Sequence, residues 1–432
     1  MPSYPTLKVE VALGVGSGGF LVLDDPILGV LDAGTLGPDI VWNDITEYVR
    51  GSRSQSSRRD RSLNAYQAGD LAIDLIDKDA RFDPTNLSGP YVVGGLSVLT
   101  AGRPVRVTAT WAGTTYPMWS GYVKAWAAAD RDGMGGDQWC TLTAVDAFTL
   151  LARNNPVAQA AVGAGELSGA RITRILDNAR WSPDLRSVAA GNSTLQATTL
   201  ATNTLTELQL TAASEQGTLF VDREGQVTFV DRYAAVTATR STVSQATFAD
   251  FAADPATSTP LTSAPIRTDD ETLINRVQLG RAGGSVQIVE DPTSIAVHSA
   301  DVPRSWGRTD LLLQTDAEVL DAAGWILSQF KTPESRFTEV TVRGATNPTA
   351  MWPVLLDLRQ RDRITVKRKR RGADIFAQDV FVEGMRHTIT VDGSGRLDWV
   401  TAYTVTPTTG YGGFLVLDDA TLGKLDTGLL AF

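Results

Sequence analysis

Short segments in which apolar and polar residues alternate follow one another from Ile40 to about Leu151. A period of two residues, as in Leu71–Ile76, is typical of strands that bury one face. Gly113 lies at the tip of one clear hairpin. The predicted strands cover 39–46, 71–76, 105–111, 119–126 and 138–146. This succession predicts a β domain over 40–151, built as a sheet or a barrel.

The hydrophobic period changes to that of helices after residue 152. Ser168 is a predicted N-cap. Thr204 and Glu207 have capping-box spacing before a second helix, which ends at Gly217. A hairpin is predicted over 218–230. The first helix would bury Ile172, Ile175, Leu176 and Ala179. These elements predict an inserted α+β unit over 152–233.

A stretch rich in Ala, Thr, Ser and Pro over 234–265 is typical of a linker or long loop. A second β domain is predicted over 266–406, with one helix that begins at a capping box made by Thr315 and Glu318. That helix would bury Val319, Ala323, Ile326 and Phe330. The whole pattern predicts a mainly β fold with an α+β insertion and short β arms at both termini.

The two arms, 1–39 and 407–432, carry a repeat. Residues 18–36 and 412–430 are identical at fourteen of nineteen aligned positions. A piece this small is marginal alone. We therefore predict that each copy docks on a partner; the alternative is that both arms pack on their own chain as edge strands. The candidate docking residues are Phe20, Leu21, Leu23, Asp24, Asp25, Leu31, Asp32, Phe414, Leu415, Leu417, Asp418, Asp419, Leu425 and Asp426.

Composition and motifs give little support for catalysis. The net charge of −10 argues against general nucleic-acid affinity. Cys140 is the single cysteine, so an intramolecular disulfide and a Cys-based zinc site are excluded. Gly14, Gly16 and Gly19 match a dinucleotide fingerprint, but a strand pattern follows them instead of a helix. We predict no cofactor, no secretory signal and no membrane span.

The two histidines, His298 and His387, lie in unrelated β contexts without metal-site or catalytic-triad spacing. No metal site is therefore predicted, although calcium binding at the Asp-Asp turns of the repeat stays open. Two basic clusters stand out against the acidic background. They are either solvated loops or contacts with an acidic neighbour or with nucleic acid that passes nearby. Their residues are Arg58, Arg59, Arg61, Lys367, Arg368, Lys369, Arg370 and Arg371.

The order of several stretches resembles the minor tail proteins of long-tailed bacteriophages, especially siphovirus-type phages that infect actinobacteria. The inserted unit also resembles the insertion of tail baseplate hub proteins and of related type VI secretion hubs. The similarity extends from about Ile40 to Thr406 and leaves the two arms unexplained. The stretches that carry it are 44–49, 53–61, 68–75, 79–84, 102–107, 119–123, 205–231, 274–277 and 382–387.

This resemblance implies a noncatalytic, trimeric baseplate hub at the virion tail tip, assembled in the host cytoplasm. Each chain would carry two tube-like β-barrels, so that three chains form a pseudo-sixfold ring below a hexameric tail tube. Implied partners are the distal tail ring or tail tube protein, the tape measure protein and other minor tail proteins. Six terminal repeats could then meet six equivalent sites on that ring.

Three other functions remain open on the sequence. One is a hexameric distal tail ring protein, which also joins tube to tip. Another is a tail-borne cell-wall hydrolase, although no separate catalytic domain is apparent. The third is a carbohydrate-binding module, because ten tryptophans are available for stacking on sugars.

Overall fold

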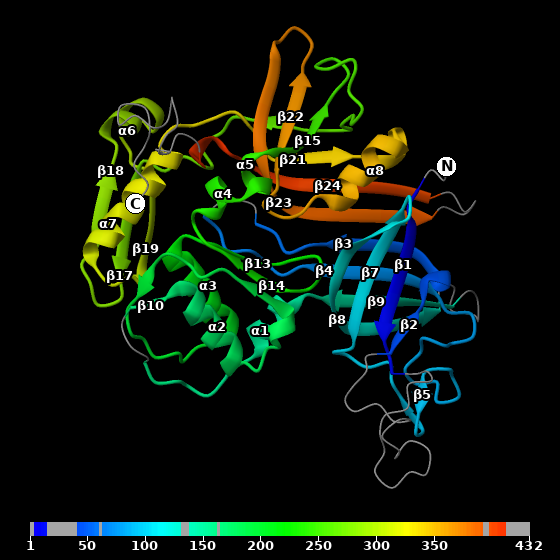
Figure 1. Ribbon diagram of the computed structural model, residues 1–432. Helices are drawn as coiled ribbons and strands as arrows, with labels where there is room; N and C mark the ends of the chain where they lie inside the picture. Colours follow the sequence, from blue (N-terminus) through cyan, green and yellow to red (C-terminus); the bar gives the residue numbers. More distant parts are fainter. Residues whose placement is uncertain are drawn as a thin grey trace.

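A computed structural model describes residues 4–14, 41–59, 63–130, 138–161, 165–391 and 397–411. The fold is mainly β, with 41% strand and 22% helix. Both copies of the terminal repeat, and Arg61, lie outside the described residues. Figure 1 shows four parts: the strands from the N-terminal part of the chain, the strands from its C-terminal part, the inserted unit with its helices, and a small unit at one side.

The strands of the first part are β1 (Thr6–Ala12), β2 (Trp42–Asp44), β3 (Val49–Gln55), β4 (Asp70–Ile76), β5 (Val92–Val93), β6 (Leu96–Ser97), β7 (Pro104–Trp111), β8 (Thr114–Asp130) and β9 (Gln138–Val145), with a 3-10 turn at Thr46–Tyr48. The alternating pattern predicted β2, β4, β7, β8 and β9, whereas β1, β3, β5 and β6 were not predicted as strands. Along β7 every second side chain is buried, as its sequence predicts.

The inserted α+β unit packs its own core between α2, α3 and a three-stranded sheet. Its elements are α1 (Ala147–Arg153), β10 (Glu166–Leu167), α2 (Ser168–Asn178), β11 (Arg186–Val188), β12 (Thr194–Leu195), α3 (Thr204–Glu215), β13 (Thr218–Val221) and β14 (Val227–Val230), with a 3-10 turn at Pro183–Leu185.

Two helix caps in this unit differ from the prediction by one residue. The N-cap of α3 is Asn203, whose side chain accepts from Thr206 N, while Glu207 accepts from the backbone of the preceding loop. The N-cap of α2 is Leu167, without a side-chain bond, because the Ser168 hydroxyl donates to Glu215 instead.

The segment 234–265 is not simply the expected loop. It contains α4 (Ala234–Thr237), α5 (Thr239–Thr242) and β15 (Ser244–Ala249). Strand β15 pairs in parallel with β22 (Arg363–Lys369) and buries Phe248 completely. The polar composition of β15 did not predict a strand, because β15 is stabilised by pairing with β22, which lies more than a hundred residues further along the chain.

The region 266–406 contains three helices in its described residues, where one was predicted. A small unit at one side of the molecule is formed by β17 (Arg276–Arg281), β18 (Gln287–Glu290), α6 (Pro292–His298), β19 (Ser305–Leu311) and α7 (Asp316–Phe330). Its core is separate from that of the large sheet. Helix α7 begins at the predicted capping box of Thr315 and Glu318, with both bonds present.

The remaining strands and the third helix lie outside the small unit. They are β16 (Ile266–Arg267), β20 (Arg336–Phe337), β21 (Glu339–Val342), α8 (Pro348–Asp357), β22, β23 (Ile375–Val391) and β24 (Leu397–Pro407), with 3-10 turns at Gly344–Thr346 and Thr409–Tyr411. Strands β16 and β20 form a separate two-stranded sheet, whereas the other four strands belong to the large sheet. No helix of the described residues is long and apolar enough to span a bilayer.

One mixed sheet of twelve strands joins the two ends of the chain, and it forms no closed barrel in the described residues. Its main path is β15-β22-β23-β3-β4-β9-β8-β7-β1-β2, and β24 and β21 lie off this path. A single hydrophobic core runs under both halves. Trp352 of α8 lies in it, with ring centroids 4.9 Å from Trp399 and 6.4 Å from Trp111.

Candidate assembly site at the joint of the two sheet halves

The two halves of the sheet contain the same three-stranded meander. In the first half it is β7–β8–β9 and in the second it is β22–β23–β24; both middle strands have 17 residues. Each middle strand pairs with the preceding strand along its first part and with the following strand along its last part. The pattern places Val123 of β8 at the position of Val382 in β23.

Backbone hydrogen bonds make this equivalence exact to the residue. Val123 N donates to Arg103 O (2.8 Å) and its carbonyl accepts from Gly102 N (2.7 Å). Val382 N donates to Asp362 O (2.9 Å) and its carbonyl accepts from Arg361 N (2.7 Å). In both strands the next residue, Lys124 or Glu383, is the extra residue of a β-bulge.

The neighbouring strands continue the correspondence. Strand β4 pairs with β9 as β21 pairs with β24. On the far side of β4 lies β3, and in the second half the segment 263–267 takes that place, through the pairs Ser263–Thr341 and Ile266–Phe337. The chain therefore contains two copies of one β unit.

The two units meet where β3 of the first pairs with β23 of the second. The pairing runs from Arg386–Gln55 to Thr390–Gly51, beyond the point where β22 ends. It continues at Met385, whose N donates to Ser56 Oγ (2.8 Å) and whose carbonyl accepts from Ser56 N (2.9 Å).

Close approach of the two units requires a glycine in β23. A Cβ on Gly384 would lie 2.4 Å from Cβ of Arg58, which is closer than real Cβ contacts allow. The corresponding residue of β8, Ala125, is exposed. We call the contact between β3 and β23, with the side chains around it, the joint.

A buried ionic cluster lies at the joint. Glu383 is completely buried, and its carboxylate binds Arg59 (2.8 Å) and Arg361 (2.7 Å). The hydroxyls of Tyr66 and Thr406 donate to the same carboxylate. Burial alone would raise the pKa of Glu383, but the charges of Arg59 and Arg361 hold it at about 2. The cluster ties the first unit, through Arg59 and Tyr66, to the second.

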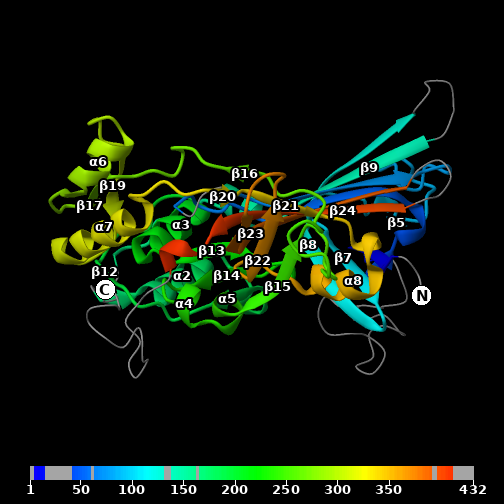
Figure 2. The ribbon, with the colours of Figure 1, turned by 90° about the horizontal axis from the view of Figure 1, so that it is seen from above.

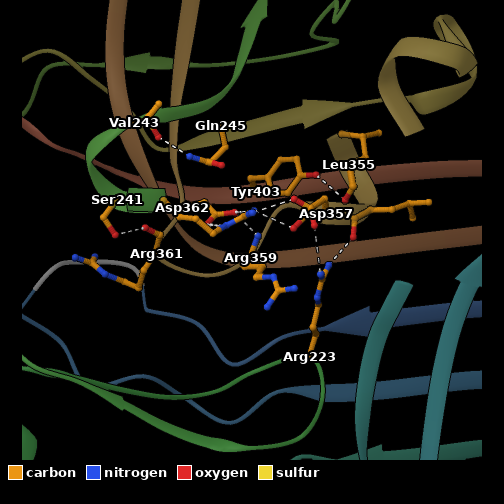
Figure 3. A network of polar contacts seen from close by, with 12 residues as sticks. Arg223, Ser241, Val243, Gln245, Leu355, Asp357, Arg359, Arg361, Asp362 and Tyr403 are labelled. Carbon is orange, nitrogen blue, oxygen red and sulfur yellow. Dashed lines mark hydrogen bonds and ion pairs between the residues drawn. The ribbon is translucent and has the colours of Figure 1, made fainter. Parts of the chain in front are cut away.

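The inserted unit is fastened to the same region by a second polar network (Figure 3). Arg223, in the turn between β13 and β14, donates to Leu356 O at the end of α8. Arg240 of α5 binds Asp357 (3.0 Å) and Asp362 (2.6 Å). The insertion and the segment after it are therefore held against the start of β22, next to the joint.

His387 is buried in the joint beside Trp399 and Thr401. Trp399 Nε1 donates to Nδ1 of His387 (3.3 Å), which leaves the proton of the neutral ring on Nε2. Burial, followed by the nearby charge of Arg223, lowers the pKa of His387 to about 4. The folded chain therefore holds this ring neutral where an unfolded chain would protonate it.

This histidine should make stability depend on pH. Because its folded pKa lies below its unfolded value, its contribution is full above about pH 6.5 and is lost as the pH falls towards 4, by roughly 3 kcal/mol at most. Urea unfolding of wild type and of His387→Gln at pH 7 and pH 4.5 measures this loss. The variant should lose less stability than wild type between the two pH values; an equal loss would contradict the assignment.

The predicted basic clusters are not brought together. Arg59 is an internal residue of the ionic cluster rather than the predicted lumen or partner contact, because Glu383 binds its buried guanidinium. Arg58 lies beside it, in an isolated bridge to Gln67. Arg368 donates to Ala264 O, and Lys367 is half-buried in β22. The exposed residues of the second cluster, at the β22–β23 turn, are Lys369, Arg370 and Arg371.

Sequence reasoning missed Glu383, Arg361 and Tyr66. The available signal was a glutamate inside an apolar strand, followed directly by glycine. Among the described residues, no group of three or more His, Cys, Asp or Glu side chains could hold a metal ion. Four tryptophans, Trp111, Trp119, Trp352 and Trp399, are buried and cannot stack on sugars.

Two solved structures share this fold. One is a tail protein from Neisseria meningitidis, with a TM-score of 0.56, 13% identity, and coverage of 92% of this chain and 96% of the other. The second is the 43 kDa tail protein of prophage MuSo2 from Shewanella oneidensis, with a TM-score of 0.52, 12% identity, and coverage of 86% and 95%. No protein-family profile matches the chain, and no curated protein matches it significantly. At these identities the likeness shows a common fold.

Proposed function

We propose that the chain is a noncatalytic structural component of a bacteriophage tail, a baseplate hub at the tail tip. The observation that carries this proposal is the presence of two equivalent β units, joined side by side into one sheet within a single chain. The two proteins described above as sharing the fold are both tail proteins, which supports the same class of role.

The duplication explains how such a hub can meet a hexameric tube. Three chains with two units each offer six similar faces around one axis, a pseudo-sixfold ring. Each unit would then contribute one tube-like segment of the ring wall, closed by its neighbours. A hexameric distal tail ring is the second candidate; the duplication favours the hub, because six chains would present twelve units.

The terminal repeats and the exposed basic turn would serve this assembly. Six repeats from three chains could dock on six sites of the adjoining distal ring or tube protein, and several weak contacts together make docking persistent. Lys369, Arg370 and Arg371 are exposed and can contact an acidic neighbour, or DNA if they face the lumen. Tape measure and other minor tail proteins are further proposed partners.

Gold labelling of phage particles tests the proposed role. An antibody raised against the purified chain should label one end of the tail, on virions assembled in the host cytoplasm. Label on the capsid, or along the whole tail, would contradict a hub. Particles whose chain lacks 412–432 should carry less label, because half of the proposed docking arms are gone; equal labelling would argue that the arms pack on their own chain. Release of muropeptides from cell walls by the purified chain would favour the hydrolase.

A further inference from the structure

Among the described residues, the last part of β8 has one edge without a neighbouring strand. Beyond Val123, β8 pairs with β9 on one side only, and no strand pairs with the other side in the described part of the chain. Ala125, Ala127, Ala128 and Ala129 are exposed there. Figure 2 shows this end of the β8–β9 hairpin extending past the neighbouring strands. In the second unit the same edge of β23 is occupied by β3.

The segment that corresponds to β3 also lacks a neighbouring strand on one side in the described part of the chain. The segment 263–267 pairs with β20 and β21 on its other side. Ala264 is buried and its carbonyl accepts from Arg368, whereas Ser263, Pro265 and Arg267 are exposed. Proline lacks a backbone N–H and is typical of edge strands. The segments β8 and 263–267 correspond to β23 and β3, which pair with each other at the joint. Each unit therefore has one strand of such a pair without its partner strand among the described residues.

We propose that the free edge of β8 pairs with the segment 263–267 of a second copy of this chain, and so repeats the joint between subunits. The pairing would be antiparallel and would place residues 127–130 of β8 where residues 386–389 of β23 meet β3. Two different surfaces meet in such a contact, so it propagates around a ring until it closes. This inference rests on the proposed function and adds its subunit interface.

Charge supports this partner. At the joint the bulged Glu383 meets Arg59, which follows β3. In the first unit the bulged residue is the exposed Lys124, and the residues that follow 263–267 are acidic, namely Asp269, Asp270 and Glu271. All three acids already pair within the chain, Asp270 with Arg304 and both Asp269 and Glu271 with Arg336. The side chain of Asp270 is nevertheless 54% exposed, so that a second cation can reach it. A contact between two copies would therefore place the cation on β8 and the anions after 263–267, the reverse of Glu383 and Arg59 at the joint. Lys124 of one copy could in this way pair with the acidic run of its neighbour.

Covering the edge also solves a problem of the monomer. An exposed strand edge presents unpaired N–H and C=O groups that invite uncontrolled pairing with other chains. Alanine has the smallest side chain after glycine, but Ala125 takes the place of Gly384, so the two strands would lie slightly further apart at that position than at the joint. In the second unit, Met385 bonds towards β3, so His387 two residues on does the same. By correspondence, Trp126 and Ala128 point their backbone groups to the free edge.

A proline at the free edge tests the interface without disturbing the fold. Ala128→Pro removes one outward N–H and leaves the pairing with β9 intact, while the control Ala128→Val keeps the N–H. Native mass spectrometry of full-length chains should find wild type and the control as closed oligomers, and Ala128→Pro as monomers. Matching urea midpoints would show that the variant is folded.

Charge reversal provides the second arm of the test. Lys124→Glu alone should raise the concentration at which half of the chains assemble by roughly tenfold, through repulsion from the acidic run. Adding Asp270→Lys to the same chain should restore assembly. Oligomers that withstand both Ala128→Pro and Lys124→Glu would overturn this interface while leaving the proposed tail role intact. A wild-type chain that stays monomeric at its highest soluble concentration would also overturn it, whereas failure of tail labelling would instead reject the proposed function.

Discussion

Replacing Glu383 with Gln should lower the free energy of unfolding by about 3–5 kcal/mol, the range measured when one partner of a buried ion pair is removed. The carboxylate is completely buried and binds both Arg59, which is buried, and Arg361, which is largely buried, so the neutral amide would leave both guanidinium groups without this counter-charge. Urea unfolding at pH 7, followed by tryptophan fluorescence, gives the change.

The matched control is Glu339→Gln. Glu339 also pairs with an arginine, Arg386, but at 3.4 Å and with its side chain 41% exposed. Such a pair contributes at most about 1 kcal/mol. A Glu383 variant that loses no more stability than this control would show that the cluster does not hold the joint. The pH dependence offers a further check: because the folded pKa of Glu383 is lowered to about 2, its contribution should persist above pH 4.5 and be lost only as the pH falls towards 2.

Truncating Trp352 to Ala should destabilise the chain by about 3–5 kcal/mol, as expected for a large aromatic removed from a core. Its ring is fully buried, and it packs between Trp399 of the second unit and Trp111 and Tyr4 of the first. Thermal or urea unfolding measures the loss.

Trp42→Ala is the control for this substitution, because Trp42 is only half-buried and packs under Arg106 near the sheet edge. Trp42→Ala should lower the free energy of unfolding clearly less than Trp352→Ala does. Two separate unfolding transitions in the Trp352 variant would show that the shared core couples the units. A single, unshifted transition would contradict the role given to α8.

Local signals in the sequence predicted local structure well. Thr315 and Glu318 bond to each other's backbone within one turn, so the start of α7 could be predicted. Ser168 and Thr204 each lie one residue after the N-cap of their helix, because the Ser168 hydroxyl donates to Glu215 and Asn203 Oδ1 accepts from Thr206 N. Strand β15 was concealed because a polar strand is stabilised only by its distant partner.

The joint could not be predicted from the sequence. The two meanders share hydrogen bonds and bulge positions, but their side chains differ, as Lys124 and Glu383 do at the bulge. Arg59 could not be distinguished from the surface arginines around it until Glu383 was placed against it, 324 residues along the chain. The candidate docking residues of the terminal repeats stay a prediction.

The number of chains in the assembled ring is the most direct test of the account. Native mass spectrometry of the full-length protein, combined with electron microscopy of the same sample, would count the subunits and show the symmetry. The account predicts three chains, with six similar units around a central opening. A ring of six chains would contradict the hub, because twelve units would then surround the axis, and it would favour the distal tail ring.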